Sequence, residues 1–475
     1  MGTQPGPTRR PAAVLAVCSL ATFLAFLDVT IVNIAFPAIT TSFASTSLAD
    51  LSWVFGAYNV VFAALLIPAG RLADLLGRRR VFTAGLALFA LASALCAVAP
   101  SAPVLVAARV LQAVAAALLV PSSLALLLPA FPPERRGAAV GTWGAMGGIA
   151  AATGPALGGL LVESFGWRAV FLVNVPLAAV ALVVALRVLA ESRDPDAGLP
   201  DPLSVLLLGA GVALVSLGIV NGEGGVWTTP GTLGPLVGGA LLVALFAWRS
   251  ARVRAPLVAP ELFRVRAFSA AVLGYLVFSA GFYALLLSNV LFMTGVWGYG
   301  VLAAGVAVTP GPIMASAASA VGGRVSDRFG ARPAIVSGGV LFAAGCLLFA
   351  TRIGPDPAYL AVFLPATLLT GTGVGLVYSG LATASVARLP AAHFGTGSAV
   401  GTCARQIGAV LGIAVLLSAL AGSADLGTFR AGWLVMTATA LLTALCGTAA
   451  GRTRLPAAPA VPVPAVPVRP VEEPA

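Results

Sequence analysis

Residues 70–79 read GRLADLLGRR, and residues 323–332 read GRVSDRFGAR, 253 positions further along the chain. Both copies share the pattern Gly-x-x-x-Asp-x-x-Gly, with arginines around it. A second repeat pairs residues 137–142, which read GAAVGT, with residues 397–402, which read GSAVGT. Each pair matches one apolar segment with the eighth segment after it. The repeats therefore predict two related halves separated by two additional segments.

The composition indicates that these segments cross a membrane. Of the 475 residues, 59% are hydrophobic and only 9% are charged, and the mean hydropathy is +1.01. In soluble domains about a quarter of the residues are charged, whereas a bilayer-spanning helix needs about 20 apolar residues. Fourteen segments of suitable length are expected at residues 12–37, 51–70, 80–99, 104–128, 138–162, 168–190, 203–221, 232–249, 268–292, 301–322, 333–351, 359–383, 396–421 and 431–450.

The predicted fold class is therefore an all-α integral membrane bundle of fourteen transmembrane helices. The N-terminal tail and the Pro-rich C-terminal tail have the composition of disordered segments. The expected parts are a tail at 1–11, an N-terminal six-helix half at 12–190, a linker with two inserted helices at 191–267, a C-terminal six-helix half at 268–450 and a tail at 451–475.

The arginines predict how the chain is oriented. All 27 basic residues are arginine, and the net charge is +11. If both termini are cytoplasmic, 22 arginines fall in inner loops and tails, three fall outside and two lie within segments. Cytoplasmic loops carry the excess of positive charge in membrane proteins. We therefore expect a multi-pass protein of the cell inner membrane with cytoplasmic termini, and no nucleic-acid partner.

Several functional classes are disfavoured by what the sequence lacks. A P-loop needs a lysine on the nucleotide phosphates, and this chain has none. Its five cysteines are scattered singly, and its one histidine, His393, lies in a short loop. No cluster of metal ligands and no pairing of a nucleophile with a base is evident. We expect no cofactor, no metal and no enzymatic activity.

Further motifs occur in order along the first half. Residues 27–37 read LDVTIVNIAFP, and residues 154–159 read GPALGG. Arg109 precedes Gln112 by one helical turn, and the pair Trp167-Arg168 is followed by NVP at residues 174–176. Together with residues 70–80, these motifs resemble the major facilitator superfamily, and in particular its fourteen-helix drug:proton antiporter branch. The resemblance covers nearly the whole chain apart from the tails, and the motifs are similar to those of methylenomycin-resistance exporters.

Three positions depart from the pattern of that family. Phe36 stands where Leu is usual, Ala113 where a fourth-helix Gly is expected, and Ala150 at a Gly position upstream of the fifth-helix motif. The resemblance implies a major-facilitator-type bundle, and a secondary transporter that exports small amphipathic compounds or antibiotics in exchange for protons by alternating access. An importer on the same fold and a membrane sensor that moves nothing remain alternatives. The expected partners are a small molecule, protons and lipid, and the expected state is a monomer.

Asp28 is the only acidic residue well inside a predicted segment. A carboxylate at that depth costs about 2.5 kcal/mol or more. At 1.5 Å per residue, Asp28 and Arg109 lie at a similar depth. A guanidinium stabilises the ionised carboxylate and burial stabilises the neutral one, so such a pair can bind and release a proton. We predict proton coupling through both residues; a purely structural pair is the alternative.

Arg405 is the second arginine within a segment, and it is followed by Gln406. Two interpretations stand: Arg405 contacts substrate, or it braces a helix through backbone carbonyls. The second half offers no carboxylate within a segment, so a charged partner must come from elsewhere, conceivably Asp28. Aromatic and polar side chains suit a cavity for amphipathic ligands. The predicted cavity residues are Asn33, Trp53, Tyr58, Gln112, Phe278, Phe282, Tyr283, Arg405 and Gln406.

Two glycine-containing motifs have predicted mechanical roles. The repeated loop motif is expected to act as a gate, because glycines permit tight turns and an Asp can pair with arginine. Its residues are Gly70, Asp74, Gly77, Arg78, Arg79, Gly323, Asp327 and Gly330. The fifth-helix motif is expected to bend a helix and seal the cavity against protons, because small residues let backbones approach and Pro removes a hydrogen bond. Its residues are Gly154, Pro155, Gly158 and Gly159.

Overall fold

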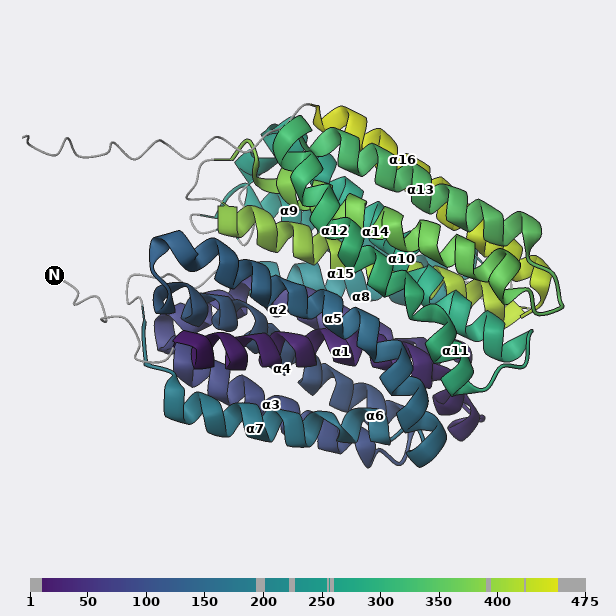
Figure 1. The fold of residues 1–475 in the computed structure, drawn as a ribbon, viewed down its shortest axis with the longest axis horizontal. Coiled ribbons are helices and arrows are strands. Elements are labelled where there is room, and N and C mark those ends of the chain that lie inside the picture. Colours follow the sequence, from purple (N-terminus) through teal and green to yellow (C-terminus); the bar gives the residue numbers. More distant parts are fainter. Residues whose placement is uncertain are drawn as a thin grey trace, which may run out of the picture.

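The described part of the chain is all-helical in the computed structural model, which describes residues 11–193, 201–221, 227–253, 256, 260–389, 394–422 and 424–451. His393 lies outside these residues. So do the predicted tails, of which only Pro11 and Gly451 are described. The α-helices are α1 (Pro11–Ser42), α2 (Leu48–Leu76), α3 (Arg78–Ala97), α4 (Ala102–Ala130), α5 (Pro133–Phe165), α6 (Ala169–Leu172), α7 (Asn174–Val188), α8 (Pro202–Asn221), α9 (Pro230–Ser250), α10 (Arg266–Gly295), α11 (Val301–Val308), α12 (Pro310–Phe329), α13 (Ala331–Arg352), α14 (Leu364–Val386), α15 (Phe394–Gly422) and α16 (Leu426–Ala450) (Figure 1). A 3-10 helix, η2 (Pro260–Arg264), precedes α10, and a π-helical turn, η3 (Tyr359–Phe363), precedes α14.

The predicted number of membrane crossings is confirmed. Among the described residues, 13 helices are long and apolar enough to cross a membrane. The fourteenth is α2, whose parts Asp50–Leu66 and Pro68–Leu76 meet at 52° and count as one span. Pro68 cannot donate a helical hydrogen bond, and its ring crowds the preceding turn, which accounts for the bend. Three other spans consist of two elements each, namely α6 with α7, α11 with α12, and η3 with α14.

The spans form two halves with matching internal packing. In the first half, α1 packs on α5, α4 packs on both α2 and α3, and α3 packs on α7. In the second half, α10 packs on α15, α14 packs on both α12 and α13, and α13 packs on α16. Figure 1 shows the first half, from purple to blue, lying alongside the second, from green to yellow. The structural repeat thus follows the sequence repeat.

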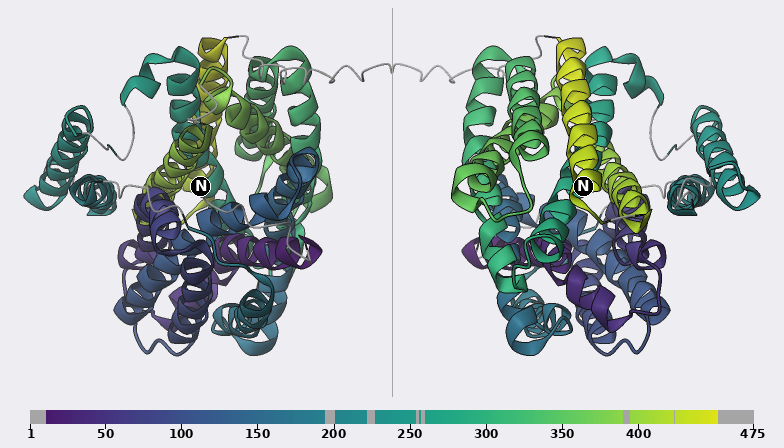
Figure 2. Two further views of the ribbon diagram at one scale, coloured as in Figure 1. Left: turned by 90° about the vertical axis from the view of Figure 1, so that its left-hand side faces the viewer. Right: turned by 90° about the vertical axis from the view of Figure 1, so that its right-hand side faces the viewer.

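The two halves meet along two seams, and the inserted helices lie outside both halves. One seam joins α2 to α15, and the other joins α5 to α11 and α12. Of the inserted pair, α8 packs against α2 and α15, whereas α9 packs against α8. The end views in Figure 2 show this pair, in teal, at the outer edge of the molecule. The cavity described below lies between the seams.

Candidate functional site

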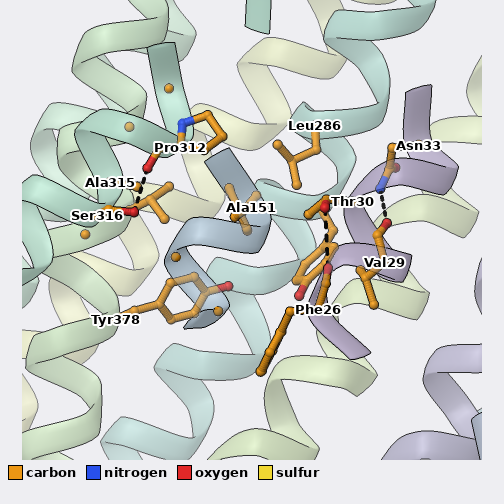
Figure 3. Close-up of a pocket in the computed structure, with 18 of the residues that line it drawn as sticks. Phe26, Val29, Thr30, Asn33, Ala151, Leu286, Pro312, Ala315, Ser316 and Tyr378 are labelled. Carbon is orange, nitrogen blue, oxygen red and sulfur yellow. Dashed lines mark hydrogen bonds between the residues drawn. The ribbon is translucent and has the colours of Figure 1, made fainter. Parts of the chain in front are cut away.

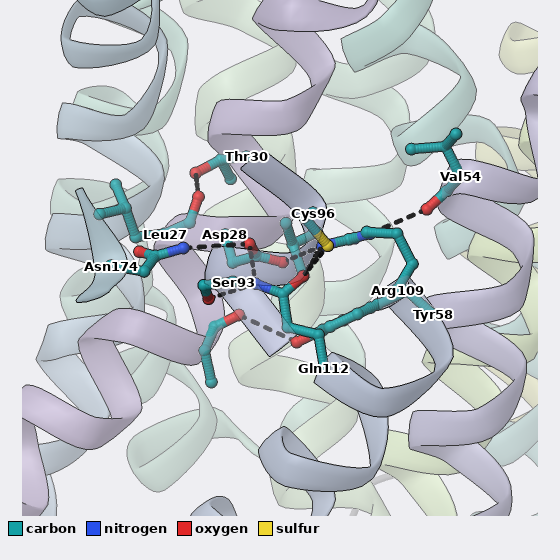
Figure 4. Close-up of polar contacts among 12 residues, drawn as sticks. Leu27, Asp28, Thr30, Val54, Tyr58, Ser93, Cys96, Arg109, Gln112 and Asn174 are labelled. Carbon is teal, nitrogen blue, oxygen red and sulfur yellow. Dashed lines mark hydrogen bonds and ion pairs between the residues drawn. The ribbon is translucent and has the colours of Figure 1, made fainter. Parts of the chain in front are cut away.

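The carboxylate of Asp28 is completely buried and is hydrogen-bonded by three side chains. Arg109 Nη1 donates to Asp28 Oδ2, and the two groups form an ion pair. Gln112 Nε2 donates to Asp28 Oδ1 at 2.8 Å, and Asn174 Nδ2 donates to the same oxygen at 3.3 Å. Arg109 and Gln112 lie on α4, and Asn174 begins α7. Figure 4 shows these groups converging on α1 from both sides.

Arg109 is held in place by groups beyond Asp28. Its Nε donates to the Val54 carbonyl at 3.0 Å, and its Nη1 also donates to Gln112 Oε1 at 2.7 Å. The guanidinium carbon lies 4.2 Å from the centre of the Tyr58 ring. Gln112 is fixed in turn, because its Nε2 also donates to Ser93 Oγ at 3.0 Å. Removing one partner from a buried ion pair typically costs about 3–5 kcal/mol, so this network holds α1, α2 and α4 in one arrangement.

The structure brings Asp28 and Arg109 into direct contact, but it corrects the predicted positions of Tyr58 and Gln112. Both were expected to line the substrate cavity, and neither does. Gln112 lies one turn after Arg109 on the same face of α4, so it faces α1. Tyr58 is buried beneath the Arg109 guanidinium. Their role in this structure is to pack and hydrogen-bond around the ion pair.

Asn174 and Ser93 belong to the network although no role is predicted for them from the sequence. Both side chains are completely buried. Ser93 carries no distinguishing sequence signal, since serine is common in membrane helices. Asn174 does carry one, because it opens the Asn-Val-Pro motif at residues 174–176. An amide at the start of a span could have been considered as a donor to a buried carboxylate.

A cavity of about 460 Å³ lies between the two halves. Its walls come mainly from α1 and α5 of the first half and from α10, α12, α14 and α15 of the second, with single residues from α2, α4, α11 and α13. Four predicted cavity residues line it, namely Asn33, Phe282, Tyr283 and Arg405. Figure 3 shows Phe26, Thr30 and Asn33 on α1, with Tyr378 and Ser316 among the residues that surround the cavity with them. Asp28 is not among the lining residues, because its side chain turns from the cavity toward α4.

Three other predicted cavity residues lie elsewhere. Phe278 is buried and packs against the rings of Phe342 and Tyr378, at 5.0 and 5.3 Å between centroids. Gln406 is buried, and its Nε2 donates to Asn59 Oδ1 at 3.1 Å, which joins α15 to α2. Trp53 is partly exposed on α2 and does not line the cavity. The sequence periodicity of helices that are apolar all round cannot tell which face meets a cavity.

Arg405 lies in the cavity wall, where no carboxylate lies among the described lining residues. Its guanidinium carbon is 5.5 Å from the centre of the Phe26 ring and 5.8 Å from that of Tyr378. Its Nε is buried and has no hydrogen-bond partner in the described part of the chain. The conceivable pairing with Asp28 is not found, because the Asp28 carboxylate is held by Arg109.

The first copy of the loop motif is joined to the end of α7. Asp74 pairs with Arg78 at 2.8 Å. The backbone N–H groups of Arg79 and Arg80 donate to the Glu191 carboxylate at 3.1 and 3.2 Å. Gly77 has a φ of 113°, and a Cβ at that position would lie 2.7 Å from the Glu191 carboxyl carbon. Only glycine fits this turn.

The second copy repeats the turn without the same contacts. Gly330 has a φ of 87°, which is again the left-handed region that favours glycine. Asp327 is exposed, and no hydrogen bond or ion pair joins it to another described residue. Gly70 lies close to Pro121 of α4, whereas Gly323 has open space around it. The two copies are therefore alike in backbone and different in partners.

The fifth-helix motif forms close helix contacts. A Cβ at Gly154 would collide with the Thr30 hydroxyl, and one at Gly158 would lie 2.9 Å from Ile31 Cγ1. A Cβ at Gly159 would lie 2.7 Å from the Leu302 Cα, in the backbone of α11. α5 continues through Pro155 without a break. The motif therefore packs α5 against both α1 and α11, and the predicted bend stays a prediction.

Comparisons with known proteins agree with this architecture. The family model described as Major Facilitator Superfamily matches residues 18–413 and 271–471. The puromycin resistance protein pur8 of Streptomyces alboniger is 37% identical over 438 residues, which are 89% of this chain and 85% of that protein. The multidrug resistance protein Stp of Mycobacterium tuberculosis is 35% identical over 408 residues, 86% of this chain and 75% of that protein. The methylenomycin A resistance protein of Streptomyces coelicolor is 32% identical over 403 residues, 85% and 84% of the two chains.

Solved structures share the fold at low sequence identity. The crystal structure of a bacterial homologue of the human lysosomal transporter Spinster, in an inward-facing and unoccupied conformation, superposes with a TM-score of 0.68 and 19% identity. It covers 95% of this chain and 100% of that one. The nucleoside transporter NupG superposes with a TM-score of 0.64 and 12% identity, covering 92% and 100%. With its multi-pass helical fold and these relatives, the chain is a membrane transporter, not an enzyme, and it belongs to the major facilitator superfamily.

Proposed function

We propose that this protein is a proton-driven exporter of small amphipathic compounds, antibiotics among them, and that it works by alternating access. The relatives named above are drug-resistance proteins that match most of the chain, which supports drug efflux. The observation that carries the proton-coupling part is the position of Asp28. It is a fully buried carboxylate near the middle of α1, hydrogen-bonded to α4 and α7 and turned away from the cavity.

Protonation of Asp28 changes the bonds that hold α1. When ionised, the carboxylate accepts charge-assisted hydrogen bonds, which are about twice as strong as neutral ones. A proton on Asp28 removes the charge that Arg109 pairs with, and it leaves the guanidinium buried without a counterion. α1 also forms one wall of the cavity, through Phe26, Thr30 and Asn33. Proton binding on one face of α1 therefore biases the position of the face that meets substrate.

In the proposed mechanism, the two halves move relative to each other at the two seams. Parallel six-helix halves that rock about a central site are a known transporter design. The cavity lies between the halves, and the close contact of Gly159 with Leu302 of α11 lies in the seam on the α5 side. We assign the gate role to the loop motif, because it ends α2, one of the helices of the seam with α15, and because the Asp74–Arg78 pair and Glu191 join that end to α3 and to the segment after α7.

The proposed topology follows from the arginine distribution. We place both termini in the cytoplasm and the protein in the cell inner membrane as a monomer. The proposed halves are residues 12–190 and 268–450, with residues 191–267 as the inserted linker. The described residues of the insert form a helical pair that packs on the α2–α15 seam rather than within either half.

An accumulation assay tests the proposal. The protein would be expressed in an efflux-deficient bacterial host with puromycin, methylenomycin A and tetracenomycin C, the compounds in the names of its relatives. We expect lower cellular accumulation of at least one compound, and restored accumulation when an uncoupler collapses the proton gradient. Higher accumulation in the expressing cells would indicate an importer. No gradient-dependent flux in proteoliposomes would indicate a sensor.

A further inference from the structure

Arg405 is a cation in the cavity wall that has no counterion among the described residues. It is the only charged side chain among the described residues that line the cavity. No ion pair joins it to a described carboxylate, and no other described group hydrogen-bonds to its buried Nε. The other arginine within the membrane, Arg109, has an ion pair and hydrogen bonds to Val54 and Gln112. The two arginines therefore differ in their partners: Arg109 is fully paired, whereas Arg405 is half-buried and faces the cavity.

Bracing a helix does not account for Arg405. Four arginines in this structure do brace backbone segments: Arg79 donates to the Leu186 carbonyl, Arg109 to Val54, Arg168 to Ala99 and Arg430 to Ile353. No such bond to a described carbonyl is found for Arg405. Its ring contacts, to Phe26 and Tyr378, lie close to the 6 Å limit for cation–π attraction. These rings flank the guanidinium and leave its N–H groups available to a ligand.

The rest of the cavity fits an amphipathic ligand with an acceptor group at one end. Phe26, Phe282, Trp143 and Tyr378 supply an apolar, aromatic wall. Asn33 lies two turns from Phe26 on α1, about 10 Å along the helix axis. Its Nδ2 donates to the Val29 carbonyl at 2.8 Å, while its Oδ1 is buried and accepts no hydrogen bond from the residues that the structure describes. A volume of about 460 Å³ lies within the range of drug-binding pockets.

Building on the proposed function, we propose that Arg405 binds the carboxylate of a monoanionic amphipathic substrate. The planar guanidinium fork matches a carboxylate in a two-point contact. The apolar body of the compound then lies against the aromatic wall, and the Asn33 oxygen accepts a hydrogen bond from a donor group at its far end. A cationic amphiphile has no counterion in this cavity, because Asp28 faces α4, and Arg405 repels it at short range.

Binding to the purified protein in nanodiscs tests this assignment. The probes are dansyl-aminoundecanoic acid, its methyl ester and a dansyl alkylamine of equal length, which differ at one end only. We expect the wild-type protein to bind the acid roughly tenfold or more tightly than the ester, the size of one charged hydrogen bond, and to bind the amine most weakly. Equal affinity for acid and ester at neutral pH would overturn the proposal.

Variants separate the guanidinium from the general shape of the cavity. Arg405→Gln should weaken binding of the acid by roughly tenfold or more and leave ester binding within about twofold. Arg405→Lys should recover part of the loss, because an ammonium keeps the charge without the fork. Arg352→Gln, at an exposed arginine that ends α13, serves as the matched control and should change neither affinity. If acid and ester lose affinity equally in Arg405→Gln, the arginine shapes the cavity and binds no carboxylate. If Arg405→Gln fails to insert, the wild-type comparison of the three probes decides alone.

Transport in proteoliposomes distinguishes this inference from the exporter proposal. Gradient-driven movement of the ester with no preference for the acid would overturn the carboxylate site and leave the exporter intact. Acid-selective binding without gradient-driven movement of either probe would overturn the exporter and leave the site. Faster movement of the acid than of the ester, lost in Arg405→Gln, is the result that both proposals predict.

Discussion

At the scale of the residue, the arrangement around Arg109 requires a guanidinium and not simply a positive charge. Its Nε and Nη1 donate to Val54, Asp28 and Gln112 in different directions, while its flat face lies against Tyr58. An ammonium on a flexible stem offers a single point of charge. The geometry of α1 relative to α2 and α4 therefore depends on the shape of this side chain.

Arg109→Lys should consequently lose most of its transport activity although the charge is kept. We expect a drop of at least tenfold in substrate uptake into everted vesicles, which is about 1.4 kcal/mol, with normal expression and membrane insertion. Arg168→Lys, at an arginine near the membrane surface that stacks on Trp167, is the control and should stay within about twofold. Wild-type efflux in Arg109→Lys would mean that charge balance alone is required.

Gln112→Leu tests whether the amide supports the carboxylate. The substitution removes one donor to Asp28 and the partner of Ser93. Loss of a hydrogen bond to a charged group costs about 1.5–3 kcal/mol, so we expect a lower melting temperature together with impaired proton coupling. Gln406→Leu also removes a buried amide bond, to Asn59, and should lower stability without altering coupling. Equal loss of proton coupling in Gln112→Leu and Gln406→Leu would show that the hydrogen bond from Gln112 to Asp28 has no specific role in coupling.

At this scale the sequence identifies charged residues within the segments, but it does not show toward which neighbour a side chain points. A carboxylate or guanidinium in an apolar segment stands out, so Asp28, Arg109 and Arg405 could all be singled out. Tyr58, Gln112 and Phe278 are assigned to the cavity wrongly, because the side of a helix that they occupy depends on neighbours that the sequence does not name. Asn174 is not assigned a role from the sequence, because its hydrogen bond to Asp28 joins α7 to α1 across 146 positions of the chain.

At the scale of the element, the glycines of α5 set the distance between helices. Gly159→Ala should force α5 away from α11, because the new methyl group would meet backbone at 2.7 Å. We expect greater proton leak in proteoliposomes in the absence of substrate, and a lower melting temperature. Gly234→Ala in α9 is the control, since nothing lies within 4 Å of its Cβ position. An unchanged proton leak in Gly159→Ala would show that the contact between α5 and α11 does not seal the cavity against protons.

The inserted helices are joined by an ion pair, and the direction in which its contribution to stability changes with pH can be derived. Asp201, just before α8, pairs with Arg249 near the end of α9 and accepts bonds from Ser204. Hydrogen bonding to Arg249, followed by that to Ser204, holds the pKa of Asp201 below its usual range. A depressed carboxylate pKa contributes stability above the unfolded value, about 3.9, that is lost as the pH falls through the folded value.

Asp201→Asn should therefore lower the melting temperature in the same way at every pH from 5 to 9, without changing the pH profile of transport. Thermal unfolding in detergent, with transport measured in parallel, checks both parts. A pH-dependent stability difference within that range would show that another group titrates with the pair. A change in the transport profile would connect the insert to proton coupling.

The elements themselves are largely predictable, and their irregularities are not. Each apolar segment is long enough to span a bilayer, so the number and order of the helices follow from hydropathy. The first helix was expected to end at Pro37, yet α1 continues to Ser42, since membrane helices tolerate proline. The breaks between α6 and α7 and between α11 and α12 depend on packing against other helices, which hydropathy does not record.

At the scale of the whole molecule, the repeat predicts two halves but not what lies between them. Both pairs of repeated motifs equate helices of the two halves, and the internal packing of the halves matches accordingly. The cavity, the Gln406–Asn59 bond across the α2–α15 seam and the unpaired Arg405 arise only when the halves face each other. No local pattern specifies that relation.

Proton binding and substrate binding are proposed to lie on opposite faces of α1. One face holds the carboxylate and its donors, and the other meets the cavity. Proton and substrate then communicate through the position of one helix and need not share an atom. Loss of the carboxylate should accordingly uncouple the two fluxes without abolishing substrate binding.

The most direct test is substrate-dependent proton movement in proteoliposomes that contain wild-type protein or Asp28→Asn. A compound whose cellular accumulation the wild-type protein lowers is added under an imposed pH gradient, and an enclosed pH dye reports proton flux. Asp356→Asn, at an exposed loop carboxylate, is the matched control. We predict substrate-stimulated proton flux in the wild type and the control, and none in Asp28→Asn, which still binds the compound. Stimulated flux at the wild-type rate in Asp28→Asn would contradict the account.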